Sequence, residues 1–79
     1  MYHIYILKLS NGSYYVGSTG NLENRMKAHS SGKVYSTKNK LPFILLYTEK
    51  FSNRSSAVQR EYQIKSWKKR VAIERLLNK

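Results

Sequence analysis

The stretch Tyr14-Tyr-Val-Gly-Ser-Thr-Gly-Asn-Leu-Glu-Asn-Arg-Met-Lys-Ala-His29 decides how this chain folds. It starts with residues that favour a strand and breaks at two glycines. A helix is then predicted from Leu22 to about Ser30, with Asn21 as its N-cap. On this helix Arg25 and His29 are four residues apart and therefore share one side. A phenol, a guanidinium and an imidazole gathered in this way indicate phosphate chemistry.

The flanking sequence completes a small α+β fold. Residues 2–9 are apolar on both parities, which predicts a central strand covered on both faces. Asn11-Gly12 predicts a type I′ hairpin turn into a returning strand over residues 13–18. A third strand is expected over 43–48, and a helix over 54–77 that breaks near Lys69-Arg70. The predicted fold is a sandwich-like α+β domain in which helices flank a three-stranded antiparallel sheet.

Composition limits the possible functions. The chain has 79 residues, enough for one small domain, and no cysteine, which excludes disulfides and Cys-ligated zinc. Its longest apolar run is far too short to cross a bilayer, and there is no signal peptide, so we expect a cytoplasmic protein with no membrane partner. Fifteen Lys and Arg against four Asp and Glu give a net charge of +11. Such a charge attracts polyanions, and nucleic acid is the expected partner.

Two further sets of charged residues are candidates for function. Lys33, Lys38 and Lys40 lie in a polar loop, which suits contacts with a nucleic-acid backbone but also an ordinary solvated loop. Glu61 interrupts an apolar stripe on the last helix, where a carboxylate needs a partner. It is either ion-paired, with Arg25 or a lysine, or a metal ligand. The stripe comprises Ala57, Ile64, Trp67, Val71, Ile73 and Leu76 or Leu77.

The order of these residues along the chain resembles the sequence pattern of a known family. His3-Ile4-Tyr5 and Tyr15-Val16-Gly17 resemble its two tyrosine-containing triplets, and the helix with Arg25 and His29 resembles its signature helix. The segment from Ala57 to Lys68 resembles the tail of its short stand-alone bacterial members. The chain thus resembles the GIY-YIG nuclease superfamily over essentially its whole length. Three departures are His3, where the first triplet has glycine, Ser18, where some members have a lysine, and the lack of an asparagine that some members carry after the glutamate.

The resemblance implies an endonuclease domain over residues 1–79 that hydrolyses DNA phosphodiester bonds, in repair or in processing of branched DNA. It implies Mg²⁺ or Mn²⁺ as cofactor with Glu61 as the metal ligand. It also implies Arg25 as the phosphate clamp, Tyr5 and Tyr15 as active-site phenols, and His29 as a further site residue. The alternative is a catalytically weak or inactive basic nucleic-acid-binding module. A protein partner could supply substrate choice in either case.

Chemistry supports these roles, although each residue also has a structural interpretation. A tyrosine near a cation becomes a better base, so Tyr15, or less readily Tyr5, could deprotonate a water molecule. His29 could carry a second proton. Alone, however, the tyrosines could be packing residues, Arg25 an ion-pair partner of Glu61 or Glu23, and His29 a partner of the last helix carbonyls.

Overall fold

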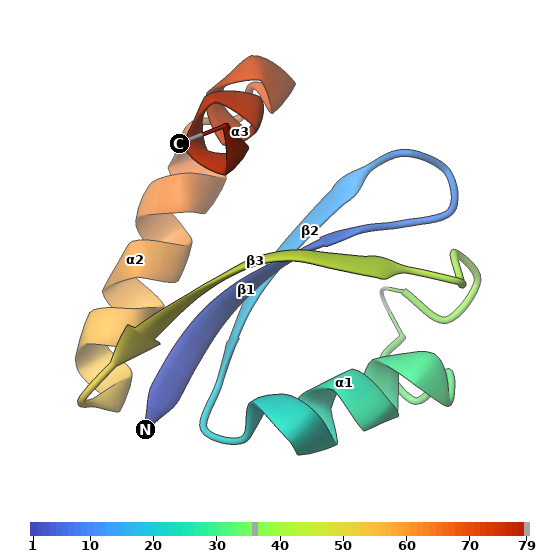
Figure 1. Ribbon diagram of the computed structural model, residues 1–79, viewed down its shortest axis with the longest axis horizontal. Helices are drawn as coiled ribbons and strands as arrows, with labels where there is room; N and C mark the ends of the chain where they lie inside the picture. Colours follow the sequence, from blue (N-terminus) through green and yellow to red (C-terminus); the bar gives the residue numbers. More distant parts are fainter. Residues whose placement is uncertain (36, 79) are drawn as a thin grey trace.

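A three-stranded antiparallel sheet lies between two layers of helix in the computed structural model, which describes residues 1–35 and 37–78 (Figure 1). The strand order β2-β1-β3 places the first strand in the centre, as the sequence predicts. Helix α1 covers one face of the sheet, and α2 and α3 cover the other. The elements are β1 (Tyr2–Lys8), β2 (Tyr14–Thr19), α1 (Leu22–Ser30), β3 (Ile44–Phe51), α2 (Arg54–Ser66) and α3 (Arg70–Leu77).

Strand β1 serves both faces because successive side chains of a strand point to opposite sides. Ile4 and Ile6 are fully buried in a cluster formed with α2 and α3, to which Val16, Ala57, Ile64 and Leu76 also belong. Tyr5 and Leu7 are equally buried on the other face, and α1 covers them with Leu22 and Met26. The central strand therefore supplies an aliphatic core on one side and the phenol of Tyr5 on the other.

The hairpin between β1 and β2 differs from the predicted type I′ turn. Only Gly12 has a positive φ, of 84°, whereas a type I′ turn requires positive φ at both central residues. The N–H of Gly12 donates to the carbonyl of Leu9 at 2.9 Å, and the N–H of Leu9 donates to that of Ser13 at 2.9 Å. This is the pattern of a three-residue loop with a left-handed glycine. Asn11 instead accepts hydrogen bonds from Ser13 through its side chain.

The helices begin where the sequence predicts them. Asn21 caps α1 by accepting a hydrogen bond from the N–H of Asn24 at 3.0 Å, and Asn53 caps α2 in the same way. The last helical segment does break, over residues 67–69. The break corrects one assignment: Val71 is 49 % exposed and not part of the buried stripe, because α3 does not continue the face of α2.

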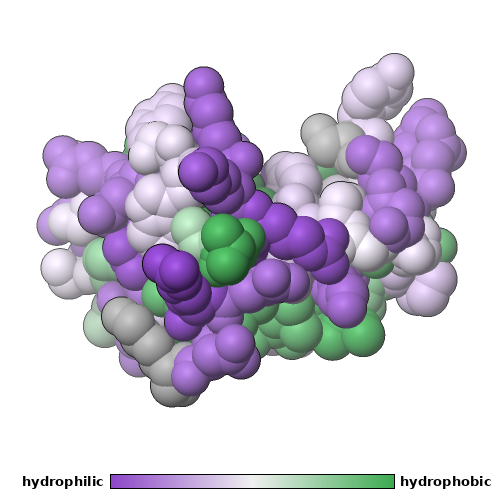
Figure 2. Space-filling model, turned by 90° about the horizontal axis from the view of Figure 1, so that it is seen from above, coloured by the Kyte–Doolittle hydropathy of each residue, from purple (hydrophilic) through white to green (hydrophobic). Residues whose placement is uncertain are grey.

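Strand β3 is an edge strand and is more exposed than its apolar sequence suggests. It runs to Phe51, three residues beyond the expected 43–48, and Ile44, Leu45 and Leu46 are all exposed. A register irregularity lies opposite Ile6 and Leu7. In the view from above, apolar residues gather on the side of the molecule where β3 begins (Figure 2). No helix in the described part of the chain is long and apolar enough to cross a membrane.

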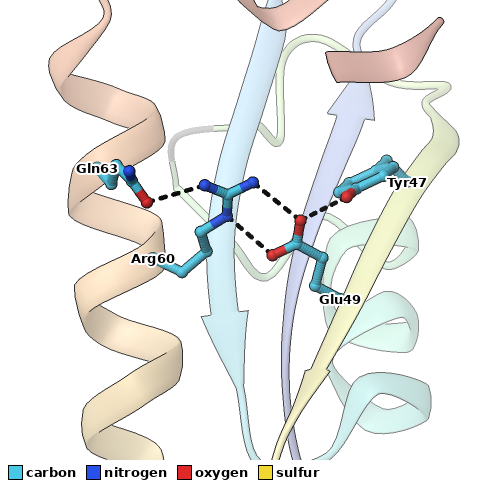
Figure 3. A network of polar contacts seen from close by, with 4 residues as sticks. All are labelled: Tyr47, Glu49, Arg60 and Gln63. Atoms are coloured by element: carbon cyan, nitrogen blue, oxygen red, sulfur yellow. Dashed lines mark hydrogen bonds and ion pairs between the residues drawn. The ribbon is translucent and has the colours of Figure 1, made fainter. Parts of the chain in front are cut away.

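An ion pair fastens α2 to β3 on the face with the aliphatic core (Figure 3). Arg60 donates through Nε to Oε1 of Glu49 at 2.9 Å and through Nη2 to Oε2 at 3.0 Å, in a two-pronged contact. Tyr47 donates its hydroxyl hydrogen to the same carboxylate, and Gln63 accepts from Nη1 of Arg60. The charge of this arginine is therefore neutralised within the fold.

Candidate active site

The hydroxyl of Tyr5 reaches the outer edge of the sheet by passing beneath Gly17. Tyr5 is opposite Gly17 in the β1–β2 register, and a Cβ atom at this glycine would lie only 2.5 Å from the Tyr5 oxygen. No side chain could occupy that position without displacing the phenol. The glycine of the Tyr15-Val16-Gly17 triplet is thus explained by close packing: it leaves room for a buried tyrosine from the neighbouring strand.

Two residues of α1 meet the Tyr5 hydroxyl. Arg25 donates from Nε to the phenol oxygen at 3.1 Å, and Nε2 of His29 lies 3.0 Å from the same oxygen. The four-residue spacing on the helix brings both side chains to this one atom. Arg25 forms no ion pair within residues 1–35 and 37–78, so the expected pairing with Glu61 or Glu23 is not observed. His29 is fully buried and binds side chains, not the last helix carbonyls.

Thr37 fixes the orientation of the imidazole. Its Oγ1 lies 2.8 Å from Nδ1 of His29 and donates its own hydrogen to the carbonyl of Val34 at 3.4 Å. Because that single hydrogen is used, the Thr37 oxygen accepts from an Nδ1–H. Nε2 of the neutral ring is then an acceptor, and it takes the hydrogen of the Tyr5 hydroxyl. Hydrogen bonds therefore run in one direction, from Arg25 through Tyr5 and His29 to Thr37.

Burial and the Arg25 charge set the protonation states in this cluster. Burial is the main cause that raises the pKa of Tyr5, while the hydrogen bond and charge of Arg25 oppose the rise and the charge of Glu61 adds to it. Burial, followed by the charge of Arg25, lowers the pKa of His29. The hydrogen bond with Tyr5 raises the pKa of Arg25. At neutral pH the cluster thus holds a neutral phenol, a neutral imidazole and one guanidinium cation.

Tyr15 belongs to the same cluster and is the more accessible phenol. Its ring centroid lies 6.3 Å from that of Tyr5 and 5.3 Å from that of His29, the second contact edge to face. Phe43 closes the other side of the imidazole at 5.8 Å. Tyr5 is fully buried, whereas Tyr15 is only partly so. A molecule at this edge of the sheet therefore meets Tyr15 and the guanidinium before it meets Tyr5.

Glu61 approaches the same edge from the opposite face of the sheet. Its Oε1 accepts a hydrogen bond from the Ser18 hydroxyl at 2.6 Å, and Ser18 directly follows the glycine that covers Tyr5. Its Oε2 pairs with Nζ of Lys65 at 2.6 Å, so of the partners considered from the sequence the observed one is a lysine. The carboxylate side chain is 17 % exposed and the lysine 48 %, so Lys65 can move away without opening the core.

The donors around Glu61 are compatible with one hard cation. Within residues 1–35 and 37–78 no three His, Cys, Asp or Glu side chains gather as a metal site, and Glu61 is the carboxylate that binds Ser18 at this edge. Mg²⁺ keeps several waters and is commonly held by one or two carboxylates together with substrate phosphates. The chemistry of this donor set therefore fits Mg²⁺ better than a cation that requires a complete cage of protein ligands.

The remaining predicted residues form no side-chain hydrogen bond or ion pair with this cluster in the part of the chain that the structure describes. Lys33, Lys38 and Lys40 are exposed in the connection between α1 and β3. Lys38 lies over the ring of Tyr35, with its Nζ 5.4 Å from the centroid. Their role toward nucleic acid stays a prediction.

Sequence reasoning missed two residues that complete the candidate site. Thr37 lies in the same polar loop as Lys33, Lys38 and Lys40, yet it is fully buried behind His29. Ser18 stands where some family members have a lysine, yet its hydroxyl binds Glu61. Both contacts join residues from separate elements, and neither periodicity nor a local motif indicates them.

Comparison with known proteins agrees with this arrangement. The family model described as the GIY-YIG catalytic domain matches residues 1–76. A UPF0213 protein of Staphylococcus haemolyticus is 38 % identical over 74 residues, which cover 92 % of this chain and 90 % of that protein. A UPF0213 protein of Oceanobacillus iheyensis is 45 % identical over 65 residues, which cover 81 % and 76 %.

A solved structure shows the same fold. The solution NMR structure of a UPF0213 protein from Bacillus halodurans superimposes with a TM-score of 0.65 at 35 % identity, and the match covers 99 % of this chain and 84 % of that one. The fold, the order of the motif residues along the chain and the similar proteins all indicate the same family. The chain belongs to the GIY-YIG nuclease family, and its relatives include the small UPF0213 proteins.

Proposed function

We propose that this protein is a divalent-metal-dependent endonuclease that hydrolyses DNA phosphodiester bonds. The observation that carries the proposal is that two adjacent residues of β2 connect two groups of side chains: Gly17 covers Tyr5, and Ser18 binds Glu61. Arg25, Tyr5 and Tyr15 lie on one face, and Glu61 reaches Ser18 on the other. A phosphodiester at this edge would meet a cation on one side and a carboxylate on the other. We place the enzyme in the cytoplasm with DNA repair or branched-DNA processing as its role.

Each protein group has a distinct task in this proposal. Arg25 binds a non-bridging phosphate oxygen and stabilises the negative charge that develops there. Tyr15, which is the accessible tyrosine, would act as the general base in its phenolate form, and it becomes the neutral phenol when it takes the proton that the attacking water loses. Tyr5 holds the guanidinium through its oxygen and gives its hydrogen to His29, so it orients Arg25 and does not need to meet water itself. Glu61 would hold Mg²⁺ or Mn²⁺, and the metal supplies further charge stabilisation at the phosphate.

The test is a cleavage assay with a matched pair of variants. Labelled single-stranded, duplex and branched DNA, and the corresponding RNA, are incubated with and without Mg²⁺ or Mn²⁺. Glu61→Ala should lose at least about 100-fold in rate, in line with loss of one electrostatic group at a reacting centre. Glu23→Ala removes the same charge from an exposed position on α1 and should cut like the wild type. If Glu61→Ala cuts as well as the wild type, or if the wild type cuts no substrate, the proposed metal-dependent nuclease activity is refuted.

One observation favours a second candidate, a nucleic-acid-binding module without turnover. Both carboxylate oxygens of Glu61 already have partners in Ser18 and Lys65. If Lys65 does not release Glu61, the wild type will bind DNA in a salt-dependent way and leave it intact with either metal. In that case Lys65→Ala should gain cleavage, whereas in an active enzyme it should not.

A further inference from the structure

A basic hollow of about 420 Å³ adjoins the candidate active site. It lies where the outer edge of β2 meets the end of α2 and the start of α3. Seen from above, hydrophilic side chains cover much of the surface of the molecule (Figure 2). We call it the junction groove. It is lined by Ser13, Tyr14, Tyr15, Val16, Ile64, Lys65, Lys68, Lys69, Arg70 and Ile73.

The rim of the junction groove is strongly cationic. Lys65, Lys68, Lys69 and Arg70 line it, and none of its lining residues is acidic. Arg70 is held in place: it donates to the carbonyl of Gly12 at 2.6 Å, and it pairs with Glu74. Lys68 and Lys69 form no ion pair with any residue that the structure describes. The groove therefore carries positive charge that the fold itself does not neutralise.

The floor of the junction groove has a different character. Val16, Ile64 and Ile73 contribute aliphatic surface, and Tyr14 contributes a ring against which Arg70 lies at 4.7 Å. A site with a cationic rim and an apolar and aromatic floor matches a ligand that is anionic along one side and weakly polar along the other. A nucleic-acid strand has this character, with phosphates along its backbone and sugars and bases beside them.

Two lining residues connect the junction groove to the candidate site. Tyr15 lines it and contacts His29 and Tyr5, and Lys65 lines it while binding Glu61. We propose that the junction groove holds the substrate strand on one side of the phosphate that is cut, with Lys68 and Lys69 binding its backbone phosphates. The inference rests on the proposed function and adds the direction from which the strand enters.

The backbone at Lys68 provides a sharp test. Its φ is 55°, the left-handed region in which glycine is favoured and lysine is strained. Lys68→Gly should therefore keep or raise the melting temperature. If the lysine binds phosphate, the same variant should bind DNA several-fold more weakly. A purely structural role predicts unchanged binding.

The main experiment measures binding without cleavage. Fluorescence anisotropy of a labelled oligonucleotide is recorded without divalent metal, between 50 and 300 mM salt, conditions over which phosphate contacts weaken strongly. Lys68→Ala with Lys69→Ala should lower affinity roughly 10- to 50-fold and reduce the slope of log K against log salt by about 1.5, since each contact contributes about 0.7 to 0.9. The control pair Lys27→Ala with Lys50→Ala removes the same charge from exposed positions on α1 and β3 and should change affinity less than threefold.

The possible outcomes separate the inference from the proposed function. Unchanged affinity and slope in the Lys68/Lys69 variant, with intact cleavage by the wild type, would refute strand binding in the junction groove. The proposed nuclease activity would be unaffected by that result. A wild type that binds no oligonucleotide at 50 mM salt overturns both. A polyglutamate competitor that displaces DNA as well as unlabelled DNA does would show a general anion surface, and this result also overturns the inference.

Discussion

Two arginine–tyrosine clusters lie on opposite faces of the same sheet and differ in one component. Arg60 contacts Glu49, which also accepts from Tyr47. Arg25 contacts Tyr5 and has no carboxylate within ion-pairing distance in the described ranges. A carboxylate neutralises the first cation, whereas a phenol orients the second and leaves its charge available. The comparison teaches that this fold neutralises one arginine with a carboxylate and holds another by a neutral phenol, with no ion pair within residues 1–35 and 37–78.

The largest expected effect is a loss of activity on removal of the uncompensated arginine. Arg25→Ala should reduce cleavage about 100- to 1000-fold, the usual cost of losing one charge-stabilising donor at a reacting phosphate or oxyanion. Its melting temperature should change little, because the cation is only partly buried and its partner is a neutral phenol. Single-turnover cleavage and thermal unfolding measure the two effects. A variant that keeps more than a tenth of the wild-type rate would contradict the role of Arg25.

Arg60→Ala should show the opposite result. It removes two charge-assisted hydrogen bonds from a carboxylate that is 22 % exposed, and we expect a loss of about 2 kcal/mol in the free energy of unfolding. For a domain of this size that corresponds to a fall of roughly 8 to 16 °C in melting temperature. Cleavage measured well below the transition should stay within threefold of wild type. A double-mutant cycle with Glu49→Gln tests whether the two residues act as a pair.

A single added methyl group can disturb the Arg25 cluster, and not the Arg60 cluster, without changing any charge. Gly17→Ala places a Cβ 2.5 Å from the Tyr5 oxygen and must displace the phenol that holds Arg25. We expect a tenfold or larger loss of cleavage and about 1–3 kcal/mol of destabilisation, as for other overpacked sites. Gly20→Ala is the matched control, since its Cβ would lie 3.1 Å from the ring of Tyr2 and outside the Arg25 cluster. Equal effects of the two alanines would show that the Tyr5 contact is not special.

Removal of the Thr37 hydroxyl should have a smaller effect, again on the Arg25 side only. Thr37→Val keeps the shape of the side chain but leaves the Nδ1–H of buried His29 without its acceptor, at a cost of about 1–2 kcal/mol in stability. The imidazole can then change tautomer, so Tyr5 loses its acceptor and Arg25 its fixed position. We expect cleavage to fall several-fold and the acid limb of its pH profile to move. Thr48→Val, at an exposed position on β3, is the control.

The smallest expected effect is a dependence of stability on pH that involves only the Arg25 cluster. The pKa of His29 is lowered in the native state, whereas in the unfolded chain it is about 6.5. Below that value the unfolded state binds more protons, so stability is fully present above pH 6.5 and falls as the pH drops toward the native pKa. Denaturant titrations at pH 8, 6 and 5 measure the slope. His29→Gln should flatten it, and an equally steep slope in this variant would assign it to other groups.

The local features of the fold could be predicted from sequence because each has a local cause. Runs of β-branched and aromatic residues indicate the strands. A capping residue indicates the start of α1, and Asn21 does cap that helix. The position of the third strand could be predicted, but its exposure could not. An apolar run does not reveal whether another element covers it. Val71 was assigned to the wrong face because the break before α3 changes the helical phase.

The candidate site was only partly predictable, since its key contacts join distant residues. The spacing of Arg25 and His29 on one helix placed them together without any tertiary information. The contact between Ser18 and Glu61 spans 43 residues, and the one between Tyr5 and His29 spans 24. Only the family resemblance indicated that Tyr5 and Glu61 belong near the others, and it gave no indication of the hydroxyl of Thr37 behind the imidazole.

The alternation of side chains along β1 makes the core and the Arg25 cluster depend on the same strand register. Ile4 and Ile6 face the aliphatic core while Tyr5 passes beneath Gly17, so the core and the Arg25 cluster depend on one register. A slip of a single residue would turn the phenol into the core and an isoleucine toward the arginine. A misregistered molecule would therefore lose the free energy of core packing as well as the site. In this chain, a single strand register is therefore required both for core packing and for the Arg25 cluster, so a molecule that lost one would also lose the other.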